Sequence, residues 1–267
     1  MTLTARRLGG WLSVRHSLRA EVLVVLGLYG VYEAARGLVV GDARQAAGHA
    51  RELVDLERSL GLFFEERVQE FVHAVPGFVD VLSFSYVTLH LLVTVGVLVW
   101  IHQRRPLAFP LVRTTLVVAS GLALIGYFTF PTAPPRLIDV GIADTVSNGT
   151  VDLNSGLVSA LYNPYAAVPS MHFGYALVVG AAVAWQSCHR MLRLAGWAYP
   201  AFILLVTIAT GNHFWLDAAA GAAAVALALV AARMITMRQI TYDAVGVGRL
   251  PAPQLRPCLD EGTRHAA

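Results

Sequence analysis

Six long apolar runs, separated by short polar segments, dominate the hydrophobic pattern of this 267-residue chain. Several of them exceed the roughly 18 apolar residues that indicate a membrane-spanning helix. We therefore expect six transmembrane helices, at residues 21–40, 78–102, 107–130, 169–187, 194–210 and 212–232. The fold class that this pattern predicts is all-α, in a polytopic membrane protein.

The segment 42–75 has a different pattern. Its large apolar residues recur at helical spacing among Arg and Glu, and they are Leu53, Leu56, Leu60, Phe63 and Phe64. This spacing predicts a pair of amphipathic helices that lie on a membrane surface.

Arginines indicate which side of the membrane each loop occupies. Residues 1–20 contain Arg6, Arg7, Arg15 and Arg19 and no acidic residue, which is typical of a cytoplasmic segment. With six helices both ends of the chain are then cytoplasmic, and the segments 42–75 and 131–167 lie outside. We expect a cytoplasmic segment at 1–20, a membrane domain at 21–235 and a cytoplasmic tail at 236–267.

Composition narrows the function classes. The chain is 56% hydrophobic and 14% charged, whereas soluble domains are typically about 25% charged. All basic residues are Arg and none is Lys, which is typical of a GC-rich genome, and we expect a bacterial plasma membrane. No basic cluster carries interleaved aromatic residues, so we expect no nucleic-acid partner. The oligomeric state is left open.

Polar residues interrupt the last apolar region between Gly211 and Asp217. Gly211 and Asn212 break the preceding helix, so we expect a new helix from Asn212 that carries His213 and Asp217 on one face. An ionisable pair at the edge of a bilayer-length apolar segment costs free energy, which favours a functional role. The alternative is a structural His–Asp hydrogen bond that caps the helix.

A second histidine stands at the start of another apolar run. Pro169 suits the first turn of a helix, Ser170 offers a capping hydroxyl, and His172 follows directly. Because helix N-termini carry partial positive charge and free N–H groups, this position favours phosphate. The expected topology brings Arg136, beside prolines, to the same outer face as both histidines. Arg136 either anchors the membrane interface or meets an anionic ligand.

Two further polar residues lie in the outer half of the second expected helix. Tyr86 and His90 are four residues apart and share a face. They form either an interhelical hydrogen bond or a contact with a substrate head group.

These motifs resemble the type-2 phosphatidic acid phosphatase superfamily, and more narrowly its inositol phosphorylceramide synthase branch. The matching motifs are Pro-Pro-Arg at 134–136, Pro-Ser-Met-His at 169–172 and Gly-Asn-His-Phe-Trp-Leu-Asp at 211–217. With the six-helix frame, the resemblance covers roughly residues 21–235. It implies phosphoryl transfer at the outer face, from a lipid phosphate or phospholipid head group, through a phosphohistidine. It also implies a lipid partner in the membrane.

The resemblance implies a role for each catalytic residue. His213 would attack phosphorus, and Asp217 would fix its tautomer and stabilise the imidazolium. His172 would protonate the leaving oxygen and then activate the acceptor.

Phosphate binding and cofactors follow from the same resemblance. Ser170, Asn212 and Arg136 would bind the phosphoryl oxygens. The resemblance implies no cofactor and no metal, and the sequence shows no ligand set that demands one. A zinc site built from His172, His213 and Asp217 is the alternative that the residue types allow.

The chain departs from the phosphatase members at two places. Met171 stands where they have Gly, and Val206 and Thr207 stand where they have a Ser-Arg pair. The transferase branch shows the same kind of loss, so hydrolysis and transfer to an alcohol, as in an inositolphosphotransferase, both stay open, and the acceptor alcohol is not identified. A non-catalytic lipid-binding or scaffold protein is the alternative from another class.

Overall fold

The computed structural model describes residues 18–37, 42–145 and 163–247. Within these ranges the elements in chain order are α2 (Leu18–Gly37), α3 (Ala43–Ser59), α4 (Glu65–His73), α5 (Phe78–Phe84), the π-helix η1 (Ser85–Leu89), α6 (His90–Arg104), α7 (Phe109–Thr129), the 3₁₀ turn η2 (Pro135–Leu137), α9 (Met171–Gln186), α10 (Arg190–Ala209) and α11 (Trp215–Val247). The all-helical expectation is confirmed over these residues.

Four stretches in the described part are long and apolar enough to cross a membrane. They are Phe78–Arg104, Phe109–Thr129, Arg190–Ala209 and Trp215–Met237. The other two expected spans differ from them. Helix α2 carries Arg19, Glu21, Glu33 and Arg36. Helix α9 is 16 residues long, shorter than the roughly 20 residues that span a bilayer.

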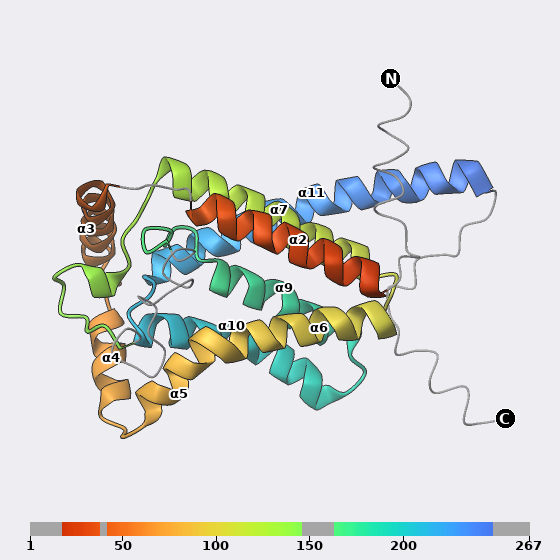
Figure 1. Ribbon diagram of the computed structural model, residues 1–267. Coiled ribbons are helices and arrows are strands. Elements are labelled where there is room, and N and C mark those ends of the chain that lie inside the picture. The colour runs from red at the N-terminus through yellow and green to blue at the C-terminus, as the bar shows by residue number, and fades with distance from the viewer. Residues whose placement is uncertain (1–17, 38–41, 146–162, 248–267) are drawn as a thin grey trace.

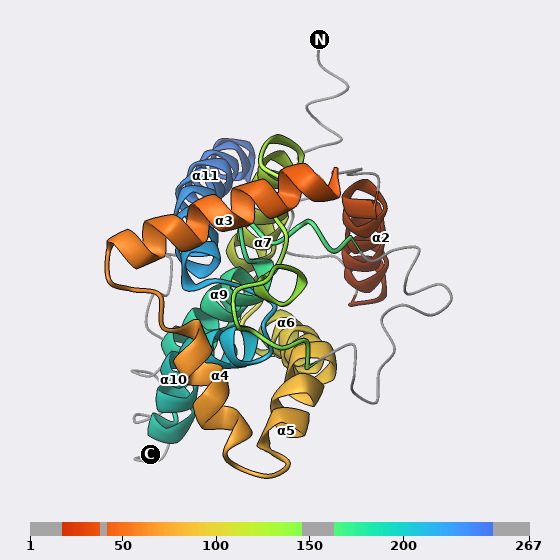
Figure 2. The ribbon, with the colours of Figure 1, turned by 90° about the vertical axis from the view of Figure 1, so that its left-hand side faces the viewer.

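Helix α9 lies in the middle of the bundle (Figures 1 and 2). It packs against α6, α7, α10 and α11. Small residues allow the helices to approach closely, because a Cβ added at Gly180 would meet the backbone oxygen of Gly196 at 2.5 Å. A site at the N-terminus of α9 is therefore surrounded by the other helices.

Polar contacts tie α2 to α7 along the bundle. Arg113 donates to both carboxylate oxygens of Glu21 at 2.6 Å, and both side chains are buried. The hydroxyls of Tyr32 and Tyr127 lie 3.4 Å apart. The expected Glu33–Arg36 pair forms, at 3.1 Å.

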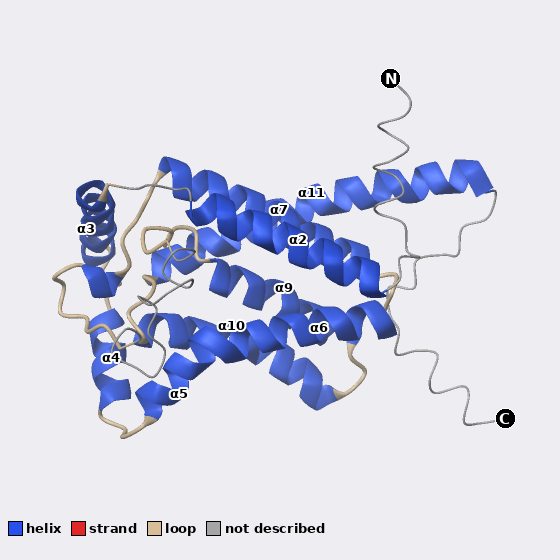
Figure 3. Cartoon of the chain, in the orientation of Figure 1, coloured by secondary structure: helices blue, strands red, loops and turns tan. Residues whose placement is uncertain are grey.

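Helices α3 and α4 lie at one end of the bundle, where the loops also gather (Figures 1 and 3). The segment 42–75 is thus helical as expected, but the predicted apolar stripe is not its buried face. Helix α3 buries Ala46, Ala50, Val54 and Glu57, whereas Leu56 and Leu60 are exposed. The small side chains face the protein because they allow α3 to pack closely over Ala133, Ile138 and Phe214.

Several helix boundaries differ from the predictions. Helix α9 begins at Met171 rather than Pro169, with Ser170 as its N-cap. Helix α11 begins at Trp215 rather than Asn212 and continues to Val247, beyond the expected end at Ala232. The expected helix 78–102 extends to Arg104 and contains the π-turn η1. Residues 1–17, 38–41, 146–162 and 248–267, which include most of the expected N-terminal segment and tail, lie outside the described residues.

Candidate functional site

A sharp turn between α10 and α11 presents His213. Gly211 has φ +67°, a left-handed conformation that glycine adopts without strain. Its N–H donates to Ile208 O at 2.9 Å and the N–H of Asn212 donates to Thr207 O at 3.0 Å. This pair of hydrogen bonds is a Schellman motif, which ends α10 and sends the chain in a new direction. His213 therefore lies in the turn, two residues before α11, and not within the helix as expected.

Asp217 holds both the turn and the histidine ring. His213 Nδ1 lies 3.2 Å from Asp217 Oδ2, and the same oxygen accepts the N–H of Phe214 at 2.9 Å. Phe214 is the residue before α11 and Asp217 is the third residue of its first turn, so the carboxylate reaches back to the N-cap. Both His213 and Asp217 are buried. With Nδ1 engaged, Nε2 is the nitrogen of His213 that can react.

The start of α9 is fixed against the start of α11. The N–H of Ser170 donates to Asp217 O at 2.9 Å, and Ser170 Oγ accepts from Phe173 N at 3.5 Å. A Cβ at Gly221 would overlap the backbone oxygen of Ser170, so the two helices touch there. This contact sets the separation of His172 from His213.

Rings gather around His172. Its ring centroid lies 5.8 Å from that of His213, 4.2 Å from that of Tyr86 and 5.2 Å from that of His90. Tyr86 lies in the π-helix η1 and His90 follows it directly; π-turns are frequent at functional sites. The interhelical alternative is met for His90, because its Nδ1 hydrogen-bonds the hydroxyl of Tyr199 on α10 at 3.0 Å. The contact with a head group stays a prediction.

One nitrogen in this ring cluster is left without a protein partner. His90 Nε2 is buried and has no hydrogen-bond partner among the described residues. Because a buried polar atom without a partner costs free energy, this nitrogen is a candidate contact for a bound group.

Arg136 lies beside the turn that carries His213. Its N–H donates to Gly211 O at 3.0 Å, and its Nε donates to Asn212 Oδ1 at 3.0 Å. The amide of Asn212 also donates to Thr210 Oγ1 at 2.7 Å. Asp144 Oδ2 is 3.6 Å from Arg136 Nη1, and the side chain of Arg136 is 2% exposed. The structure thus brings together Arg136, Asn212 and His213, as expected for a site that binds an anion.

Helix α4 also braces these loops. Gln69 donates to Ala143 O at 2.9 Å and to Ala209 O at 3.2 Å, and it accepts from Ala143 N at 2.7 Å. It thereby joins the segment after Arg136 to the end of α10. The sequence analysis did not single out Gln69.

Two acidic residues at the site were missed as well. Glu57 and Glu65 are fully buried, and each accepts a backbone N–H from the first turn of α11. The signal was present for Glu57, which follows Ala46, Ala50 and Val54 at helical spacing on one small-residue face.

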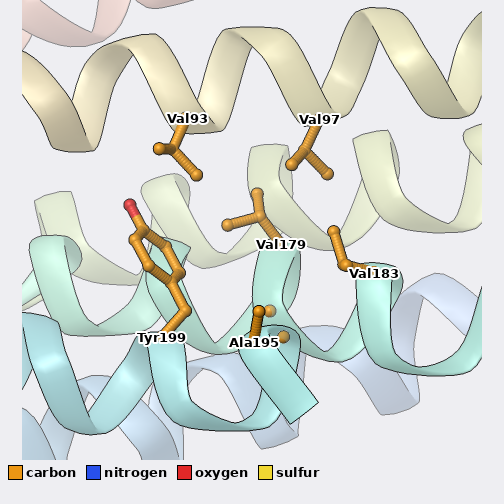
Figure 4. Close-up of a pocket in the computed structure, with 8 residues that line it drawn as sticks. Val93, Val97, Val179, Val183, Ala195 and Tyr199 are labelled. Atoms are coloured by element: carbon orange, nitrogen blue, oxygen red, sulfur yellow. The ribbon is translucent and has the colours of Figure 1, made fainter. Parts of the chain in front are cut away.

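A partly open cavity of about 150 Å³ lies between α6, α9 and α10. It is lined by Val93, Val97, Val179, Val183 and Tyr199. Among the labelled side chains, only Tyr199 carries a polar group, its hydroxyl (Figure 4). That hydroxyl is the partner of His90. An apolar cavity of the membrane region is therefore linked through Tyr199 and His90 to the ring of His172.

The zinc alternative gains no support from the geometry. Among the described residues, no group of three or more His, Cys, Asp or Glu side chains could hold a metal ion.

A comparison with protein families places these features in context. The model of the PAP2 superfamily matches residues 51–231, a range that contains Arg136, His172, His213 and Asp217. The comparison with curated proteins gave no match, and neither did the comparison with solved structures. The match covers well over half of the chain and every motif described above. This chain belongs to the PAP2 superfamily.

Proposed function

We propose that this protein is a membrane enzyme that takes the phosphoryl group from a lipid phosphate or a phospholipid head group through a phosphohistidine at His213. Membership of the PAP2 superfamily supports an activity of the phosphatase or phosphoryl-transfer type. The observation that carries the proposal is the 3.2 Å contact between His213 Nδ1 and Asp217 Oδ2, with the ring of His172 close by. It leaves His213 Nε2 as the nucleophile and fixes the tautomer that exposes its lone pair.

In the first step, Nε2 of His213 attacks phosphorus. A P–N bond forms, and the P–O bond to the leaving oxygen breaks with its electron pair. His172 gives that oxygen a proton, and Asp217 stabilises the imidazolium that forms on His213. The product is a phosphohistidine and the free alcohol of the lipid.

In the second step, His172 takes a proton from the acceptor, which is water or an alcohol. The acceptor oxygen forms a new P–O bond while the P–N bond breaks. His213 returns to its neutral form and His172 is protonated again. The cycle balances without any cofactor.

In this proposal Arg136, Asn212 and Ser170 bind the phosphoryl oxygens, together with the first N–H groups of α9. Arg136 and Asn212 lie together beside the turn that presents His213, at 3.0 Å from one another. Ser170 and the first N–H groups of α9 lie beside His172. Charge-assisted donors of this kind stabilise the charge that develops on a phosphoryl group in the transition state.

The proposal so far allows either water or an alcohol as the acceptor of the phosphoryl group. At the positions of the Ser-Arg pair of phosphatase members, Val206 and Thr207 are fully buried. The hydroxyl of Thr207 is bonded to Leu204 O at 3.0 Å, so it is not directed at a phosphate. We favour transfer to an alcohol, as in the inositol phosphorylceramide synthase branch, with Tyr86 and His90 Nε2 as contacts for the head group.

The membrane arrangement completes the proposal. Helices α2 and α9 would join the four apolar stretches as the fifth and sixth spans. Helices α3 and α4 would lie on the extracytoplasmic surface above the site. A lipid tail would lie between the helices, where the cavity lined by Val93 and Val179 offers apolar space.

A turnover assay on a panel of lipids tests the proposal. Lipid phosphates, lipid diphosphates and phosphoinositides, each with long and short acyl chains, are offered with and without an acceptor alcohol. Release of the water-soluble phosphate measures hydrolysis, and formation of a labelled phosphodiester of the acceptor measures transfer. Transfer that exceeds hydrolysis and favours long chains is the expected result. If no substrate is turned over while lipid still binds, the non-catalytic scaffold replaces this proposal.

A further inference from the structure

The start of α11 is held by three carboxyl groups. Successive backbone N–H groups of Phe214, Trp215 and Leu216 donate to Asp217, Glu65 and Glu57, at 2.9, 3.0 and 3.2 Å. The first N–H groups of a helix have no partner within it, so these acceptors satisfy donors that would otherwise be buried without one. Glu57 comes from α3 and Glu65 from α4. The two outer helices therefore hydrogen-bond to the start of α11, two and three residues after His213.

Three buried carboxyl groups cannot all be charged cheaply. The charged groups that face Glu57 are Glu65 from α4 and Asp217 from α11, and both are acidic. Among the described residues no ion pair includes Glu57 or Glu65. Burial and the repulsion from Glu65 raise the pKa of Glu57 to about 9.

Of the two outer carboxyls, Glu57 and Glu65, the hydrogen bonds favour Glu57 as the one that carries a proton. Asp217 Oδ1 is also buried without a hydrogen-bond partner, but Asp217 Oδ2 accepts from Phe214 and faces the ring of His213. Both oxygens of Glu65 accept backbone N–H groups, from Phe64 at 2.9 Å and from Trp215 at 3.0 Å. Glu57 accepts only at Oε1, and its Oε2 is buried with no donor facing it. A proton on Oε2 removes this deficit, because the O–H then donates to the neighbouring Glu65 carboxylate.

We propose that Glu57 and Glu65 are positioning residues, which hold the nucleophile His213 in place through a carboxyl–carboxylate pair that shares one proton. Neither residue contacts the reacting atoms. They act through the first turn of α11, whose Asp217 holds the ring of His213. The inference rests on the proposed function for its kinetic readout, and on spectroscopy for a readout without turnover.

Substitution by glutamine should have different effects at Glu57 and at Glu65. Glu57→Gln keeps an oxygen for the N–H of Leu216 and places an amide N–H where the proton would be, so it should keep wild-type kcat near neutral pH. In Glu65→Gln the side-chain NH₂ group must face one of the two backbone N–H groups that Glu65 now accepts. Two donors cannot bond to each other, so the start of α11 should be displaced. A displacement of about 1 Å can cost roughly 100-fold in rate. We expect Glu65→Gln and Glu57→Ala to lower kcat by about 10- to 100-fold with little change in KM. The control is Glu52→Gln, an exposed acid on α3.

The pH profile adds a second readout. The raised pKa means that the folded protein binds the proton of Glu57 more tightly than the unfolded chain does. In the unfolded chain the pKa of Glu57 is near 4.5. This contribution to stability is complete below about pH 4.5, shrinks as pH rises, and is lost once pH passes about 9. Wild-type kcat should therefore fall above about pH 9, and Glu57→Gln should lack this fall.

Infrared spectroscopy of purified protein reports on the proton directly. Wild type should show the carbonyl band of a protonated carboxyl at pH 7 that is missing from Glu57→Gln. Absence of that difference, or a Glu57→Gln enzyme as impaired as Glu57→Ala, overturns the shared proton. Wild-type kcat in both Glu57→Ala and Glu65→Gln overturns the positioning role. If wild type turns over no phosphate substrate but keeps the band, the proposed function fails and the carboxyl pair stands.

Discussion

At the scale of single residues, the feature that most needs an explanation is the carboxylate of Asp217, which is buried beside His213. Asp217 is fully buried, and a buried charge without donors is costly. The N–H of Phe214 and the ring of His213 both face its Oδ2. These contacts partly compensate the burial of Asp217 and also orient the ring of His213, whereas Asp217 Oδ1 is buried without a hydrogen-bond partner.

Arg136 offers the sharpest residue-level test of phosphate binding. Arg136→Lys keeps the charge but loses the fork of donors and the bond from Nε to Asn212. Loss of one charge-assisted hydrogen bond costs about 1.5–3 kcal/mol, so kcat/KM should fall by roughly 10- to 100-fold. Steady-state kinetics on the best lipid substrate measure the change. Arg67→Lys, an exposed arginine on α4, is the control, and an equal effect in both variants would remove Arg136 from the site.

The sequence singled out the candidate site residues but not the residues that surround them. His172, His213, Asp217 and Arg136 stand in short motifs, so local spacing was enough to single them out. Glu57 and Glu65 stand among other acids of a charged segment, where composition favours a solvated face. Their burial depends on α3 and α4 folding back over α11, a contact between residues 150 and 159 positions apart. The small-residue face of α3 indicates that Glu57 is buried, but no local pattern shows that it packs on α11.

At the scale of elements, the apolar helices were predicted well, and the largest error is the C-terminal end of α11. Hydrophobic periodicity located every apolar helix of the described part to within a few residues at most ends. The start of α11 was misplaced because the Schellman turn at Gly211 takes up residues that have good helical periodicity. The π-turn before His90 was also missed, since a single extra residue per turn leaves no clear mark on an apolar sequence.

Gly211 tests the role of this turn. Gly211→Ala places a side chain at φ +67° and a Cβ within 2.9 Å of Ile142 and 3.2 Å of Arg136. The left-handed conformation alone costs about 1–2 kcal/mol. We expect lower thermal stability in detergent and a loss of activity, because Arg136 and His213 must shift.

Gly77 provides the matched control for that variant. It has φ +75° but nothing within 4 Å of an added Cβ. Gly77→Ala should lose similar stability to the backbone strain and keep kcat. Equal kcat in the two variants would show that the turn at Gly211 does not position the site.

At the scale of the whole molecule, the bundle places chemistry at one end and apolar packing along its length. Helices α3 and α4, the loop after α7 and the starts of α9 and α11 gather at that end (Figures 1 and 3). Helix α9 begins at the site and has 16 residues, and α2 carries four charged residues. These two features explain why length and apolarity identify four stretches in the described part while six are proposed to cross the membrane.

Cysteine labelling tests the proposed topology. Single cysteines replace Glu52, exposed on α3, and Gln103, exposed near the end of α6, in a chain whose Cys188 and Cys258 are changed to Ser. An impermeant thiol reagent added to intact cells should label the cysteine at 52 and leave the cysteine at 103 unlabelled until the cells are opened. Labelling of both from outside would contradict the arrangement.

The most direct measurement of the central claim is to trap the phosphoryl group on the enzyme. Removal of a general acid–base costs typically about 10²–10⁴-fold, but a substrate with an activated leaving group, such as a nitrophenyl phosphate, needs little proton donation. On labelled substrate of this kind, His172→Ala should form a phosphoenzyme whose label survives alkali, is lost in acid and maps to His213. His213→Ala should carry no label. Label on the His213→Ala protein, or wild-type turnover by that variant, would contradict the phosphohistidine mechanism.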